Sequence, residues 1–185
     1  LAAAAIAARL GGGAAAGCPP DSAALCAIGA TFVTLESAGS LRGCIGSLDA
    51  VRPLYLDVAR NAVRAMTDPR LPPVTAADWP ELDVSVSVLS TPEPLPAGGL
   101  AELAGALRPG VDGLILTDEV RRATFLPVVW AKLTQPVEFV SALLVKGGWP
   151  AGEWPAEMRA ARYAVVEFHS RAPRAPFERA NRETL

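Results

Sequence analysis

Histidine and cysteine are scarce in this sequence, which limits the metal and nucleophile chemistry that it can carry. It has one histidine, His169, and three cysteines, Cys18, Cys26 and Cys44. Because no two cysteines have the CxxC spacing and only one histidine could assist them, we expect no structural zinc site, and the cofactor stays unknown. The odd number and wide spacing of the cysteines argue against a disulfide framework, so we expect reduced thiols and a cytoplasmic protein.

The sequence also lacks long apolar runs and an excess of positive charge. No apolar run reaches the roughly 18 residues that a membrane-spanning helix needs. The formal net charge of −2 provides no basic surface, so we expect neither a nucleic acid nor a membrane as a partner. A hydrophobic content of 51% over 185 residues predicts a globular protein with one domain or two subdomains. The abundance of alanine, glycine, proline and arginine points to a GC-rich bacterial genome.

Hydrophobic periodicity predicts a succession of strands and helices in the first half of the chain. Residues 31–35 and 41–46 read as the two strands of a β-hairpin. A helix is predicted from Pro53, with apolar residues at helical spacing, and it ends at Asp68-Pro69-Arg70. Residues 82–88 alternate between apolar and polar side chains, which predicts a strand with one face on a core.

The second half begins after a connector at residues 91–99, which contains three prolines and two glycines. This composition marks a loop, and we place the subdomain boundary there. The connector is followed in order by a predicted helix, two strands, a second helix and a final strand. Their predicted ranges are 100–107, 114–117, 123–126, 136–146 and 163–168.

The stretch Leu41-Arg42-Gly43-Cys44-Ile45-Gly46, the 41–46 motif, places a thiol two residues after an arginine and between two glycines. In a regular strand, side chains alternate between the two faces. Arg42 and Cys44 are therefore predicted on one face, and Leu41 and Ile45 on the other, anchored to a core. The glycines predict that some group approaches the backbone closely at this strand.

The 41–46 motif resembles the hallmark sequence of the AMMECR1 family. The resemblance continues through most of the chain, in the order that the family shows. The further matching blocks are residues 61–70, 84–90, 92–94, 110–114 and 125–130. The chain departs from the family pattern in two loops of its second half, at residues 120–124 and 146–149, which puts any ligand contact carried by those loops in doubt.

The resemblance implies an α+β fold of two subdomains, each built around an antiparallel sheet packed with helices. The larger subdomain carries both termini and is expected at about 1–94 plus 150–185, and the smaller one at about 95–149. The family supplies no established reaction. Its context in genomes implies a shared pathway or complex with Memo-like and radical-SAM proteins, while the oligomeric state stays unknown.

The motif offers two candidate chemical groups, each with two interpretations. Cys44 is either a nucleophile, if a nearby cation such as Arg42 favours its thiolate, or a small buried side chain. Arg42 either binds a carboxylate or phosphate group through its planar guanidinium, or forms a salt bridge. The only histidine is a possible partner for Cys44, but its place beside the polar C-terminal tail favours a solvated residue at a strand end.

The polar face of the strand at 82–88 carries Asp83, Ser85 and Ser87. We expect this face to line the same cleft as Cys44 if the two strands lie in one sheet, a hypothesis that requires Ser85 and Cys44 to share a sheet face. Glu167 is a further candidate acid or base, although a salt bridge is the simpler role.

The site therefore consists of the candidate catalytic residue Cys44 and of candidate binding residues on both strands. The binding residues are Arg42, Gly43, Gly46, Ser85 and Ser87. Because a hydrolytic site needs a base and an orienting group, which the sequence scarcely provides, a binding or accessory module is favoured. The alternative is an enzyme in which Cys44 is the nucleophile and Arg42 binds an acidic group of the substrate.

Overall fold

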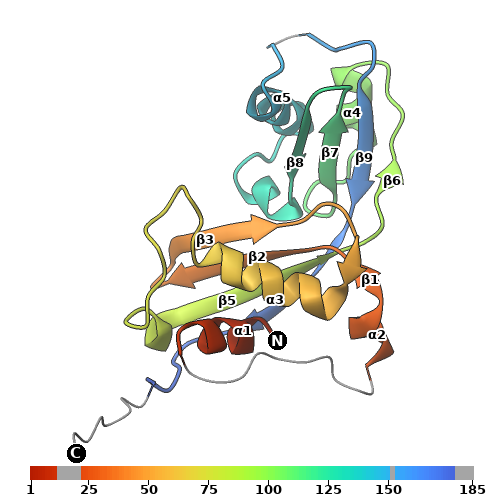
Figure 1. Cartoon of the computed structure of the whole chain (residues 1–185). Helices are drawn as coiled ribbons and strands as arrows, with labels where there is room; N and C mark the ends of the chain where they lie inside the picture. Colours follow the sequence, from red (N-terminus) through yellow and green to blue (C-terminus); the bar gives the residue numbers. More distant parts are fainter. Residues whose placement is uncertain (12–21, 151–152, 178–185) are drawn as a thin grey trace, which may run out of the picture. The chain divides into compact units, whose positions relative to one another are not determined.

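The computed structural model describes residues 1–11, 22–150 and 153–177 and divides the chain into two compact units (Figure 1). The first unit comprises Leu1–Val88 and Glu167–Leu185, and the second comprises Leu89–Val166. Each unit contains a four-stranded antiparallel sheet with helices, which confirms the α+β prediction. The division differs from the predicted boundaries near 94 and 150, because residues just outside 95–149 supply two strands of the second sheet.

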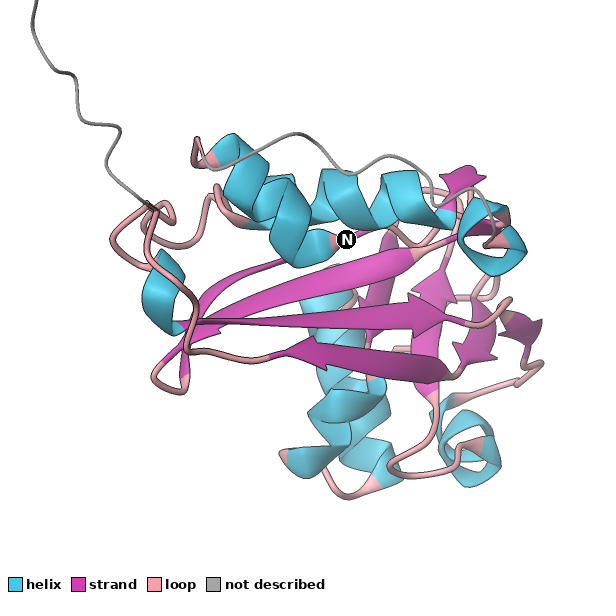
Figure 2. Ribbon diagram, turned by 90° about the horizontal axis from the view of Figure 1, so that it is seen from below, coloured by secondary structure: helices cyan, strands magenta, loops and turns pink. Residues whose placement is uncertain are grey.

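The sheet of the first unit has the strand order β10-β5-β2-β3. These strands are β2 (Thr31–Ser37), β3 (Ser40–Gly46), β5 (Leu82–Leu89) and β10 (Val165–Ser170). Strand β2 pairs antiparallel with both β3 and β5. The pairing with β3 is the predicted hairpin, and β5 is the strand that the alternating pattern of residues 82–88 predicted. Helices α1 (Ala2–Arg9) and α3 (Leu54–Ala65) lie side by side over one face of this sheet (Figure 2).

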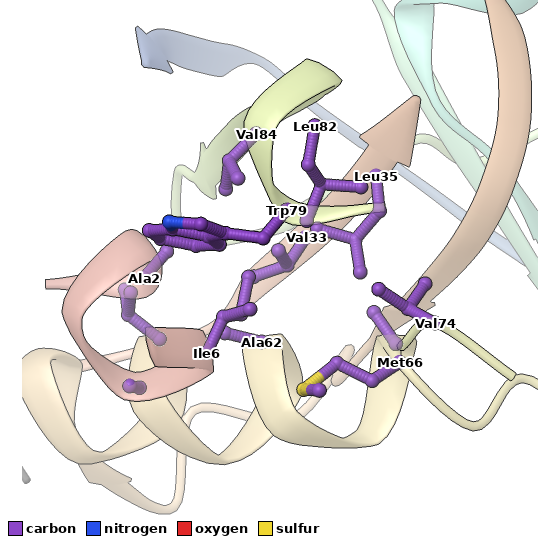
Figure 3. Packing of buried hydrophobic residues seen from close by; sticks show 13 residues of the cluster. Ala2, Ile6, Val33, Leu35, Ala62, Met66, Val74, Trp79, Leu82 and Val84 are labelled. Carbon is purple, nitrogen blue, oxygen red and sulfur yellow. The ribbon is translucent and has the colours of Figure 1, made fainter. Parts of the chain in front are cut away.

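Alternate residues of β2 and β5 form the core beneath these helices. Val33, Leu35, Leu82 and Val84 are almost completely buried and contact Ile6 of α1 and other side chains of the same cluster (Figure 3). The helix predicted to begin at Pro53 is α3, and its buried positions include apolar residues at helical spacing, Val58, Ala62 and Ala65, together with the polar residues Asp57 and Asn61. Short elements connect these parts: α2 (Ala23–Cys26), the paired strands β1 (Ile28–Gly29) and β4 (Arg52–Pro53), and the 3₁₀ turn η1 (Trp79–Glu81).

A buried polar network attaches the start of β2 to α3. Asp57 is completely buried and accepts hydrogen bonds from the backbone and hydroxyl of Thr31, at 2.9 and 2.8 Å, and from Asn61 at 3.0 Å. Arg52 forms an ion pair with the same carboxylate. Since a buried carboxylate is costly unless it is paired, this arrangement fixes where α3 lies on the sheet.

The sheet of the second unit has the strand order β6-β9-β7-β8. These strands are β6 (Glu93–Pro94), β7 (Gly113–Thr117), β8 (Arg122–Phe125) and β9 (Arg159–Tyr163). Helices α4 (Leu100–Ala106) and α5 (Pro136–Gly147) pack against each other, and α5 contacts β7 and β8. The turn η2 (Pro127–Ala131) places Trp130 in a stacked contact with Phe139, with ring centroids 3.9 Å apart.

Two expectations about the chain need correction. The strand predicted at 163–168 is divided between β9, which ends at Tyr163, and β10, which begins at Val165, so the two strands join different sheets. Cys26 is disulfide-bonded, contrary to the expectation of reduced thiols, whereas Cys44 is free.

Within the described residues, no helix is long and apolar enough to cross a membrane. Residues 11–20, whose glycines and prolines indicate a loop, lie outside the described residues apart from Gly11.

Candidate functional site

A β-bulge in β3 changes which side chains of the 41–46 motif share a face. Leu35 pairs with Gly43, but the next residue of β2, Glu36, pairs with Leu41, so Arg42 is the extra residue of the bulge. Leu41 consequently lies on the same face as Cys44 and is 45% exposed. The predicted placement of Leu41 with Ile45 is therefore wrong, because the bulge interrupts the alternation on which it rested. Arg42, as the extra residue of the bulge, is paired with no residue of β2 that would assign it to a face, so its placement with Cys44 stays a prediction.

The guanidinium of Arg42 is held by an acidic side chain of the first unit. Its Nη2 lies 3.0 Å from Oδ1 of Asp78, which directly precedes the buried Trp79. The Nε atom of Arg42 is also buried and has no hydrogen-bond partner within the described part of the chain. Arg42 thus forms a salt bridge, which is one of the two roles predicted for it.

Both glycines of the motif make room for other parts of the protein. A Cβ atom on Gly43 would lie 1.9 Å from the backbone oxygen of Ala65, the last residue of α3. A Cβ atom on Gly46 would lie 2.2 Å from the ring of Phe32, its partner on β2. The close approach predicted for the motif is thus filled at both positions by packing within the first unit, and a binding role for either glycine stays a prediction.

The backbone of Cys44 is held by two side chains from the loop after α3. Its N–H donates to Oδ2 of Asp68 at 3.0 Å, and its carbonyl oxygen accepts from Nη2 of Arg70 at 3.0 Å. Asp68 and Arg70 are joined by bonds of 2.9 and 2.6 Å between their side chains. Since β3 is an edge strand of its sheet, this pair satisfies backbone groups that a neighbouring strand would otherwise satisfy. We call Asp68 and Arg70 the side-chain clamp.

The clamp also defines the electrostatics around Cys44. Hydrogen bonding to Arg70 is the main cause that holds the pKa of Asp68 far below its usual range, and the backbone N–H groups of Cys44 and Arg70 act in the same direction, while burial opposes them. The pKa of Arg70 is raised, chiefly by Asp68 and to a smaller extent by interaction with Cys44. Arg70, which bonds to the Cys44 carbonyl oxygen, is therefore a cation beside Cys44 that the sequence did not indicate.

Polar side chains form a row across the four strands of the first sheet. Thr34 is the direct partner of Cys44 on one side and of Ser85 on the other. Its hydroxyl donates to the Cys44 sulfur at 3.4 Å, and the Ser85 hydroxyl lies 2.9 Å from Nδ1 of His169. Ser85 and Cys44 thus lie on the same face, as the hypothesis of a shared surface requires.

A second group of polar side chains adjoins this row. Ser87 donates to Oε1 of Glu167 at 3.3 Å, and Oε2 of Glu167 lies 3.7 Å from Nε2 of His169. We call the surface formed by these side chains and the row the polar face. Its members are Thr34, Cys44, Ser85, Ser87, Glu167 and His169. Asp83, also predicted there, accepts a hydrogen bond from the backbone of Ala172 at 2.7 Å.

The geometry of the polar face favours hydrogen bonding over nucleophilic catalysis. Cys44 and His169 lie on the two edge strands of a four-stranded sheet, so about 14 Å separates their strands and a direct pair is excluded. Among the described residues, Thr34 is the hydrogen-bond partner of the Cys44 sulfur. The described residues also contain no group of three His, Cys, Asp or Glu side chains that could hold a metal ion.

The similarity of the chain to known proteins extends over most of its length. The model of the AMMECR1 family matches residues 1–168. The chain belongs to the AMMECR1 family. A protein of Methanothermobacter thermautotrophicus is 40% identical over 141 residues, which are 75% of this chain and 73% of that protein. Protein MJ0810 of Methanocaldococcus jannaschii is 34% identical over 137 residues, which are 72% of this chain and 68% of that protein.

A solved structure supports the same conclusion for the fold. The crystal structure of the uncharacterized protein PH0010 from Pyrococcus horikoshii matches with a TM-score of 0.84 and 30% identity, over 96% of this chain and 91% of that one. The three relatives named here come from archaea, so they do not support the expected bacterial source. Their names state no activity, and the function of this AMMECR1-family chain has to be argued from its own site.

Sequence reasoning did not recognise three residues of the site, namely Thr34, Asp68 and Arg70. Asp68 and Arg70 were identified only as the end of a helix, although an aspartate and an arginine two positions apart after a helix are able to form an ion pair. Thr34 occupies the central position of the row because its strand lies between β3 and β5. Only the order of the strands reveals that position.

We predict that Gly43→Ala destabilises the protein by about 3 kcal/mol, because the added methyl group forces the backbone of α3 away from β3. Urea unfolding followed by circular dichroism measures the change. The control is Gly105→Ala in α4, where a Cβ atom meets nothing within 4 Å and stability should rise by up to about 1 kcal/mol. A Gly43 variant as stable as the wild type would contradict the close approach.

We predict that Asp68→Asn lowers the free energy of unfolding by about 3 kcal/mol at pH 7, because charge-assisted hydrogen bonds to Arg70 and Cys44 are lost. The folded pKa of Asp68 is depressed, so its contribution is complete above the ordinary Asp pKa of about 3.9 and is lost as the pH falls toward the folded value. The difference between wild type and variant should therefore shrink between about pH 5 and pH 2. Glu119→Gln, on an exposed turn, should change stability by less than about 0.5 kcal/mol. A difference that stays constant with pH would contradict the assignment.

Proposed function

We propose that this AMMECR1-family chain is a binding or accessory module that acts with Memo-like and radical-SAM proteins through the polar face and the adjoining 41–46 motif. The observation that carries the proposal is the row Cys44–Thr34–Ser85–His169, which spans four strands of one sheet. A sheet holds such side chains at fixed spacing, so they present a preorganised set of hydrogen-bond donors and acceptors.

The side-chain clamp supports the same function. The backbone of Cys44 is bonded on both its N–H and its carbonyl group, and Gly43 lies against α3, so the edge strand is held in place before any partner arrives. A surface that is rigid before binding loses little conformational entropy in the complex. Leu41 adds an exposed apolar side chain at the border of the polar face. A mixture of apolar and polar contacts is typical of protein interfaces.

The alternative function is that of an enzyme with Cys44 as the nucleophile. It is favoured by Arg70, whose guanidinium bonds to the Cys44 carbonyl oxygen and brings a positive charge to the residue. In this alternative Arg42 binds an acidic substrate group, which requires that Arg42 exchange its contact with Asp78 for the substrate. The row does not have the geometry of a hydrolytic site, because His169 contacts Ser85 through Nδ1 and lies far from the Cys44 sulfur.

We predict that the double variant Ser85→Ala, His169→Ala weakens binding to the Memo-like or radical-SAM protein of the same genome by about tenfold or more, since two hydrogen-bonding groups of the row are lost. Biolayer interferometry with each purified partner measures the affinity. Ser141→Ala is the control, because the Ser141 hydroxyl bonds to the backbone of its own helix in the second unit. The proposal fails if the wild type binds neither partner, or if the double variant binds as tightly as the wild type.

We predict that iodoacetamide alkylates Cys44 at pH 7 no faster than it alkylates glutathione, because in the part of the chain that the structure describes the sulfur is bonded to a hydroxyl and to no base. Mass spectrometry of the digested protein locates and quantifies the modification. A rate more than about tenfold above that of glutathione, lost in Arg70→Gln but kept in Arg60→Gln, would favour the nucleophile instead.

A further inference from the structure

The second unit contains a groove that the 41–46 motif does not involve. It lies on the sheet face opposite the core helices, because Ile115 and Thr117 line it while the alternate residues Leu114 and Leu116 are buried in the cluster with α4 and α5. Its volume is about 660 Å³, which lies within the range of small-molecule sites in proteins. All of its lining residues belong to the second unit.

Most of the groove is apolar and built from rigid parts. The ladder places Pro94 beside Ala161, and Ala161 beside Ile115, so two small or flat side chains leave space above the isoleucine. Pro92 and Pro96 extend the wall that Pro94 begins. Proline has a fixed φ angle, so this wall loses little entropy when a ligand binds.

One end of the groove is polar and positively charged. Thr117 is the direct partner of Arg159 on β9 and of Arg122 on β8, so both arginines flank its hydroxyl on the same face. Arg159 is exposed and makes no ion pair with any of the described residues. None of the described residues that line the groove is acidic. An exposed guanidinium beside a hydroxyl is suited to a planar anion, because the guanidinium can donate two parallel N–H groups to such an anion.

We propose that this groove binds a small amphipathic carboxylate, with its carboxylate on Arg159 and Thr117 and its apolar body on Ile115, Ala161 and the proline wall. A purely inorganic anion would leave the apolar part uncovered, and a neutral apolar molecule would make no use of the Arg159 guanidinium. The combination of an apolar trough and a terminal guanidinium selects a molecule that has both parts.

A titration of the full-length, ¹⁵N-labelled protein with octanoate tests the proposal by NMR. We expect saturable shifts of the backbone amides at 93, 95, 115–117 and 159–161. Octanol, which has the same apolar body without the charge, should bind at least about tenfold more weakly, and sodium phosphate should not compete at equal concentration. Salt should weaken the binding of octanoate more than that of octanol, because only octanoate is charged.

Two variants separate the two parts of the site. Arg159→Gln should raise the dissociation constant of octanoate about tenfold and leave that of octanol unchanged, whereas Arg121→Gln, on the neighbouring turn outside this groove, should change neither. Ala161→Phe fills the trough and should abolish binding of both molecules, and the amide spectrum of the variant shows whether it is folded. The proposal is overturned if octanoate shifts amides elsewhere, if phosphate displaces it, or if Arg159→Gln binds it as the wild type does.

Discussion

The buried carboxylate of Asp68 joins the end of α3 to the edge strand β3, and the geometry of the site depends on it. One of its oxygens receives the backbone N–H of Cys44, and both engage Arg70, which in turn bonds to the Cys44 carbonyl group. This bridge is possible because Gly43 lets the last turn of α3 approach the strand. The position of Cys44, and with it one end of the polar row, follows from these contacts.

The two units present surfaces of different chemical character. The first sheet carries hydroxyl, thiol, imidazole and carboxylate groups that bond to one another, a surface suited to reciprocal hydrogen bonds with a protein partner. The second sheet carries an apolar groove with arginines at one end, a surface suited to an amphipathic anion. Such a pair of surfaces fits an accessory protein that recognises a partner with one unit and a small molecule with the other.

The sequence predicted most elements of the fold because their periodicity is strong. The alternation in residues 82–88 and the helical spacing after Pro53 both correspond to observed elements, β5 and α3. The final strand was less predictable, since β9 and β10 are separated by a single residue and belong to different sheets. The site was predicted only in part: Ser85 and Ser87 do share a face with Cys44, but the bulge at Arg42 also places Leu41 on that face, where the alternation did not put it. A bulge depends on how two strands pair. The alternation of side chains within one strand carries no information about that pairing.

The sequence by itself determined the α+β class and the family, because periodicity and motif order are properties of the chain alone. The tertiary structure decided which residues surround Cys44. Arg70 bonds to its carbonyl oxygen, Thr34 links it to Ser85, and His169 stands two strands beyond Thr34. The physical reason is that strand order, register and the close packing at Gly43 bring together residues that are far apart in the sequence, and no local pattern encodes these distances.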